Sequence, residues 1–127
     1  MVAVSKNFTF DELKCKHCGK MHIPQSSIDR LQRVRDRVGH VLKVSSGYRC
    51  PEHNNVVSST GRTGPHTVAA FDIAVHGPEA FHVLVAALAE GFVGIGVNQK
   101  GPLEQRFIHL DDLPDADGRP RPGVWSY

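Results

Sequence analysis

The sequence predicts an α+β fold, in which a small, mainly antiparallel sheet is flanked by helices. Helix-like and strand-like segments are interspersed, in the order helix, helix, strand, helix, strand, helix, strand, strand. The strand-like segments alternate apolar and polar residues, which is typical of a sheet with one open face. The chain has 127 residues and no internal repeat or linker, so one domain spanning residues 1–127 is expected.

Four segments carry helix signals, and they cover residues 7–13, 26–38, 51–57 and 78–90. In the second, Ser26 and Asp29 resemble a capping box, and Gly39 follows the last turn as a stop. The side of this helix that is predicted to face the core carries Ile28, Leu31, Val34 and Val38. In the fourth, the stripe predicted to be buried carries Phe81, Leu84, Val85 and Leu88.

Four segments are predicted to be strands, and they cover residues 41–48, 69–75, 93–97 and 106–110. In the second of these, "AAFDIAV", Phe71 and Ile73 lie on the core face and Asp72 on the opposite face, because side chains alternate along a strand. In "FIHLD", His109 and Asp111 likewise share the face away from the core. The proline-rich tail "GRPRPGVWSY" has no regular pattern.

The composition argues against two classes of partner. The formal net charge is +2, aromatic residues are 7% of the chain and the basic residues are scattered, so a nucleic-acid-binding surface is not indicated. No apolar run approaches the roughly 20 residues of a membrane span, and the N-terminus lacks the apolar region of a secretory signal. We therefore expect a protein made in the cytoplasm that does not bind membranes. Its eight histidines are unusual in so short a chain and favour a test for metal binding.

Asp72 raises the main chemical question, because a lone carboxylate among apolar residues is costly to bury. A divalent cation would neutralise it. His66 lies in the loop just before this strand, and His109 lies on a strand that can pair with it. Two imidazoles and a carboxylate suit zinc, which in catalytic sites keeps a fourth position for water. The alternatives are that Asp72 caps a turn or pairs with Arg49, and that the histidines are ordinary surface or hydrogen-bonded residues.

The cysteines form a separate pattern. Cys15 and Cys18 belong to "CKHC", while Cys50 and His53 belong to "CPEH", and together they have the spacing of a structural zinc site. Free thiols, or a disulfide between Cys18 and Cys50 after release from the cell, are the alternatives.

Several motifs occur in an order that resembles the M15 family of zinc peptidases, the D-alanyl-D-alanine carboxypeptidase-like group that includes small phage lysins. They are "SSGYRCPEHN", a loop histidine followed by "AFDI", then "GIG", "FIHLD" and a closing "WSY". The resemblance covers about residues 8–127. It implies the fold shared with the zinc domain of hedgehog signalling proteins, an antiparallel sheet flanked by helices.

The resemblance also implies a site and a reaction. The zinc ligands would be His66, Asp72 and His109, and Arg49 would bind the carboxylate or carbonyl oxygen of the substrate. The reaction would be hydrolysis of a peptide bond in peptidoglycan, by a monomer that reaches the cell wall after release from the cell or as part of a virion. Asp111 is the first choice for the general base and Glu104 the second, although Asp111 could instead orient a ligand histidine.

Two departures from the family pattern favour an alternative function. Five residues separate His66 from Asp72 where the family has six, and Arg106 stands where several members have an acid. The alternative is a catalytically inactive module that contains a metal and binds the cell wall or a partner protein.

Overall fold

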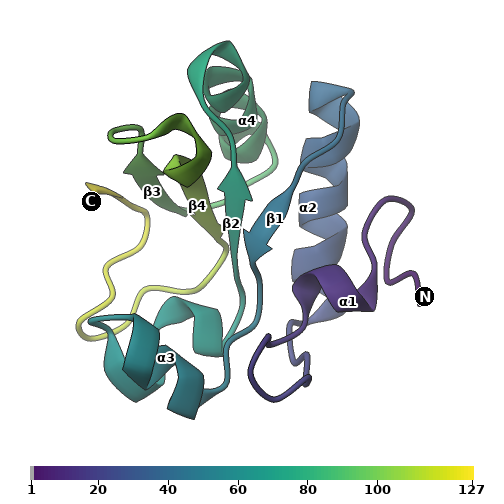
Figure 1. Cartoon of the computed structure of the whole chain (residues 1–127). Helices are drawn as coiled ribbons and strands as arrows, with labels where there is room; N and C mark the ends of the chain where they lie inside the picture. The colour runs from purple at the N-terminus through teal and green to yellow at the C-terminus, as the bar shows by residue number, and fades with distance from the viewer. Residues whose placement is uncertain (1) are drawn as a thin grey trace.

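The computed structural model describes residues 2–127 and contains a five-stranded sheet with helices packed around it (Figure 1). The strands follow one another across the sheet in the order β1 (Val44–Ser46), β2 (Ala70–Ala74), β4 (Phe107–Asp111), β3 (Gly94–Asn98) and β5 (Gly123–Ser126). All neighbours pair antiparallel except β3 and β5, which pair parallel. The predicted α+β class with a mainly antiparallel sheet is confirmed.

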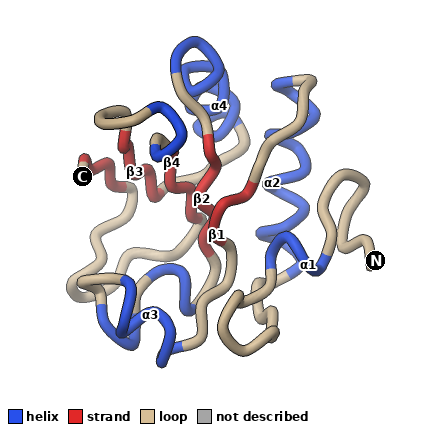
Figure 2. Tube along the Cα trace, in the orientation of Figure 1, coloured by secondary structure: helices blue, strands red, loops and turns tan. Residues whose placement is uncertain are grey.

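The α-helices of the described chain are α1 (Phe10–Leu13), α2 (Gln25–Val38), α3 (Pro51–Val57) and α4 (Gly77–Ala89). Helices α2 and α4 contact each other. In the view of Figure 1, α2 lies to the right of β1 and α4 lies above β2. Helix α3 and two short 3-10 turns, η1 (Gly61–Thr63) and η2 (Pro65–Thr67), lie at the lower end of β2 in that view, where long loops also gather (Figure 2). No helix among residues 2–127 is long and apolar enough to cross a membrane.

The start of α2 differs from the expected capping box. The helix begins at Gln25, directly after Pro24, and no side chain caps it. Ser26 and Asp29 therefore lie inside the helix, because Pro24 takes the extended N-cap conformation, with φ of −58° and ψ of 143°, two residues before the expected N-cap. The other end agrees with the prediction: Gly39 adopts a left-handed conformation, with φ of 76°, and its amide donates to the Arg35 carbonyl.

Most of the face of α4 that was predicted to be buried is exposed, and of the four residues named only Leu84 packs, partly buried, against the core. Phe81, Val85 and Leu88 are 64%, 50% and 57% exposed. The residues that α4 buries are Ala80, Val83, Ala86 and Ala87. This helix is apolar on both sides, so the hydrophobic pattern does not decide which side faces inward, and the small alanines allow close packing.

The core face of the sheet agrees with the predicted alternation. Phe71 and Ile73 of β2, together with Ile108 and Leu110 of β4, belong to the main apolar core and are at most 1% exposed. The residues between them on both strands project to the other face. That face holds the polar side chains of the site.

Candidate metal centre

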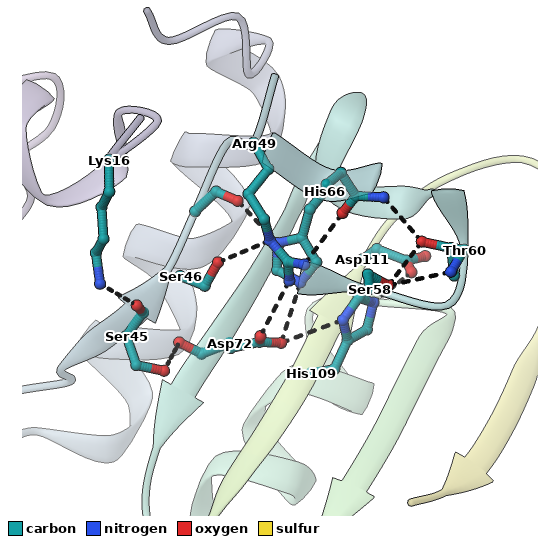
Figure 3. Close-up of polar contacts among 12 residues, drawn as sticks. Lys16, Ser45, Ser46, Arg49, Ser58, Thr60, His66, Asp72, His109 and Asp111 are labelled. Carbon is teal, nitrogen blue, oxygen red and sulfur yellow. Dashed lines mark hydrogen bonds and ion pairs between the residues drawn. The ribbon is translucent and has the colours of Figure 1, made fainter. Parts of the chain in front are cut away.

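Two neighbouring strands place a carboxylate beside an imidazole. Asp72 of β2 is paired with His109 of β4, and Asp72 Oδ1 lies 3.3 Å from His109 Nδ1. His66, in the turn η2, brings its Nε2 to within 3.2 Å of the same carboxylate oxygen (Figure 3). One ligand atom from each of the three residues lies within 4.8 Å of the other two. The three residues that the sequence nominates as metal ligands therefore meet in one place.

The short spacing between His66 and Asp72 does not separate them. The turn η2 ends at Thr67, Val68 follows it with a side chain that is 44% exposed, and β2 begins at Ala70. The five-residue interval still allows the two side chains to touch.

The outer nitrogens of both imidazoles are already engaged. His66 Nδ1 lies 2.7 Å from the Gly47 carbonyl oxygen, which can only accept, so this nitrogen carries the proton. His109 Nε2 lies 2.7 Å from Asp111 Oδ2 and donates to it. In the neutral rings, the nitrogens that face Asp72 consequently present lone pairs, which is the tautomer a metal ligand needs.

The centre is buried and negatively charged. His66, Asp72 and His109 are 5%, 9% and 2% exposed. Burial alone would raise the pKa of Asp72, but in the metal-free protein its contacts with the His109 and His66 rings, when these carry a second proton, outweigh burial and hold that pKa well below its usual range. Burial would lower the pKa of His109, but its contacts with Asp111 and Asp72 raise it. Asp72 is therefore ionised at neutral pH and attracts positive charge.

This donor set fits a divalent cation. Two lone pairs and a carboxylate oxygen converge at contact distance, and they repel one another unless a cation lies among them. Without a cation, a second proton on one of the two rings, whose centroids lie 5.1 Å apart, relieves the repulsion, and metal binding would release that proton. Two imidazoles with one carboxylate are a common ligand set for catalytic zinc.

Arg49 lies at the edge of this centre, three residues after β1. Its Nε donates to Ser46 Oγ at 3.1 Å and its NH1 to Asn54 Oδ1 at 3.0 Å, while its NH2 is 3.7 Å from Asp72 Oδ2. Its backbone amide donates to the His66 carbonyl at 2.9 Å. The sequence did not single out Asn54, whose side chain is buried and fixes the guanidinium.

Asp111, the first choice for the general base, is completely buried with both oxygens engaged. Oδ2 accepts from His109 Nε2 and from Arg121 NH2, each at 2.7 Å, and Oδ1 accepts from Arg121 Nε at 2.8 Å. This arrangement favours the role of orienting His109 over proton transfer. Glu104, the second choice, is exposed on η3 (Leu103–Gln105) and makes no hydrogen bond or ion pair with the centre in residues 2–127.

The C-terminal segment contributes two residues that the local pattern did not identify. Arg121 clamps Asp111 and lies over the Trp125 ring, 5.0 Å from its centroid. The Trp125 ring lies 5.0 Å from that of His109. The strand β5, which the sequence pattern missed, holds Trp125 opposite Gly96 of β3. The closing "WSY" was the one sequence signal for this contact.

The two glycines of "GIG" make room for these groups. A Cβ atom at Gly94 would lie 2.1 Å from Asp111 Oδ1, and one at Gly96 would lie 2.6 Å from Trp125 Nε1. Any side chain at either position would displace the residues that support His109.

Comparison with known proteins gives one family. A family model described as peptidase M15 matches residues 6–111, which include Arg49, His66, Asp72 and His109. The match ends before Arg121 and Trp125. No curated protein and no solved structure matches the chain.

Proposed function

Because the chain belongs to the peptidase M15 family, we propose that it is a zinc-dependent peptidase that hydrolyses peptide bonds of peptidoglycan. The bond would be one next to a D-amino acid, cut in the manner of a D-Ala-D-Ala carboxypeptidase or an endopeptidase. The observation that carries the proposal is the convergence of two imidazole lone pairs on the carboxylate of Asp72, with the opposite nitrogens locked by Gly47 and Asp111.

Each residue of the site has a task in this proposal. His66, Asp72 and His109 hold the ion, which when bound polarises the scissile carbonyl and lowers the pKa of water. Asp111 fixes the His109 ring, and Arg121 fixes Asp111. Arg49 offers forked N–H donors at the rim, suited to a substrate carboxylate or carbonyl oxygen.

One observation favours the alternative of a metal-containing module without turnover. Both oxygens of Asp111 are engaged, and Glu104 lies outside the centre, so neither residue is placed as a general base. In that case the same three ligands would hold a metal, while the protein would bind the cell wall or a partner without cutting it.

A turnover assay separates the two functions. Zinc-loaded protein is incubated with purified muropeptides between about pH 5 and 9, the range in which catalytic groups of this kind titrate. Release of D-alanine or of new amino termini, abolished by a chelator and restored by zinc, supports the peptidase. Tight zinc and peptidoglycan binding with no product at any pH supports the inactive module and contradicts the proposal. A phage-lysin role for a monomer belongs to the same proposal, and lysis of cell walls by gel-filtered protein tests it.

We expect Arg49→Lys to weaken substrate binding while leaving the metal in place. Lysine keeps the positive charge near Asp72 but cannot make the forked contact, so KM should rise about 10-fold, the effect of losing one charge-assisted hydrogen bond. Steady-state kinetics with parallel zinc analysis measure this. Arg62→Lys is the matched control, because Arg62 forms an exposed ion pair with Glu52 and should change neither quantity. An unchanged KM in Arg49→Lys would remove Arg49 from substrate binding.

A further inference from the structure

A second cluster of metal-binding side chains lies outside the centre described above. Cys15 and Cys18 belong to the loop that follows α1, and Cys50 directly precedes α3. Although these segments are far apart in the sequence, the three sulfur atoms lie within 4.8 Å of one another. All three are free thiols in the structure.

The loop that carries the first two cysteines is folded into a tight turn. The Cys15 amide donates to the Lys20 carbonyl at 2.7 Å, and the Gly19 amide donates to the Cys15 carbonyl at 2.9 Å. Gly19 has φ of 76°, a conformation that other residues rarely adopt. The turn, which depends on the left-handed conformation of Gly19, therefore brings Cys15 and Cys18 close to Cys50.

Two further contacts suit a metal bound by thiolates. The Cys50 amide donates to Cys15 Sγ at 3.3 Å, and such a donor stabilises negative charge on sulfur. An imidazole is also at hand: His17 Nδ1 lies 3.4 Å from Cys50 Sγ, and the ring of His17 stacks on that of His53 with centroids 5.6 Å apart. Three sulfurs and an imidazole nitrogen are a standard ligand set for structural zinc.

We propose that Cys15, Cys18 and Cys50 bind a structural zinc ion, with an imidazole of the His17–His53 pair as the fourth ligand. This site shares no ligand with the first and does not depend on peptidase activity.

Such an ion would support the first site through the backbone between them. It would join the turn after α1 to the start of α3, and the residues just before Cys50 contact the end of α1 and the turn η2 that carries His66. The Tyr48 amide donates to the Leu13 carbonyl at 2.8 Å, and the Arg49 amide donates to the His66 carbonyl at 2.9 Å. The same segment supplies the Gly47 carbonyl that fixes the His66 ring. The structural zinc would thereby fix the segment that positions Arg49 and the His66 ring.

Metal stoichiometry of four proteins tests the proposal. Protein purified under reducing conditions should contain about two zinc ions per chain. Cys18→Ser should lose one, and it should fold because Cys18 is exposed. His109→Ala should lose the other, and the double variant should lose both. With cobalt in place of zinc, the near-ultraviolet absorption of thiolate-to-cobalt charge transfer should persist in His109→Ala and disappear in Cys18→Ser.

The outcomes distinguish this site from the first. If Cys18→Ser keeps the wild-type metal content and cobalt spectrum, the thiolate site is overturned, whatever the result for His109→Ala. A disulfide found by mass spectrometry in protein purified with metal and without oxidant would overturn it too. Loss of zinc affinity in either His17→Ala or His53→Ala identifies the imidazole ligand and supports the proposal, whereas wild-type affinity in both contradicts a fourth imidazole ligand.

Discussion

Alanine in place of His109 is expected to empty the first metal site and to lower hydrolysis by more than about 10³-fold. Losing one preorganised polar group of an active site costs up to roughly this factor, and here the cation would be lost together with its ligand. His109 Nδ1 is one of two imidazole nitrogens that face Asp72, so its removal leaves an incomplete ligand set. Elemental analysis and product release, measured on the same preparation, check both effects.

The variant should remain folded, because Asp111 keeps its two contacts with Arg121 when the imidazole is removed. His82→Ala is the matched control, since His82 is exposed on α4 and should keep full metal content and activity. Wild-type zinc content and turnover in His109→Ala would contradict the ligand assignment. Normal zinc content with lost turnover would instead assign His109 to the chemistry alone.

The alternation of side chains along the strands predicted much of the site from the sequence. Because side chains alternate along β4, the sequence alone assigns His109 and Asp111 to one face and Ile108 and Leu110 to the other, as the structure confirms. The same argument assigned Asp72 and Phe71, which are neighbours on β2, to different faces of the sheet. The pairing of the two strands, which brings Asp72 beside His109, does not follow from alternation: the sequence showed only that the strands can pair, and the family resemblance implied that the two residues share a metal.

The sequence did not predict the contacts of the C-terminal segment, because alternation along one strand gives no information about them. Strand β5 pairs with β3, which lies far from it in sequence, so no local pattern reveals that Trp125 lies beside His109. Asp111 could be predicted as a neighbour of His109, but its two candidate roles differ only through Arg121, which occupies its remaining lone pairs. A residue's chemical task depends on partners that folding supplies.

Removing Arg121, the partner of Asp111, should lower the stability of the protein as well as its activity. Arg121→Ala is expected to lower the free energy of unfolding by about 3 kcal/mol at neutral pH, because it leaves a buried carboxylate without its cation. Arg121 and Asp111 have side chains that are 6% and 0% exposed, so water cannot replace the lost contacts. Urea unfolding of the metal-free forms measures the difference between variant and wild type. Arg119→Ala is the control, since Arg119 donates to the Pro114 carbonyl and should change stability by less than about 0.5 kcal/mol.

The pH dependence of this difference identifies its cause. Burial alone would raise the pKa of Asp111, but the hydrogen bonds from His109 and Arg121 lower it to about 2, below the value of about 3.9 for an unfolded chain. A carboxyl group whose pKa is lowered on folding stabilises the protein above the unfolded pKa, and that contribution disappears as the pH falls through the folded pKa. The stability gap between wild type and Arg121→Ala should therefore be full above about pH 4 and shrink towards pH 2. A gap that stays constant across this range would mean that Arg121 acts through packing on Trp125, not through the charge of Asp111.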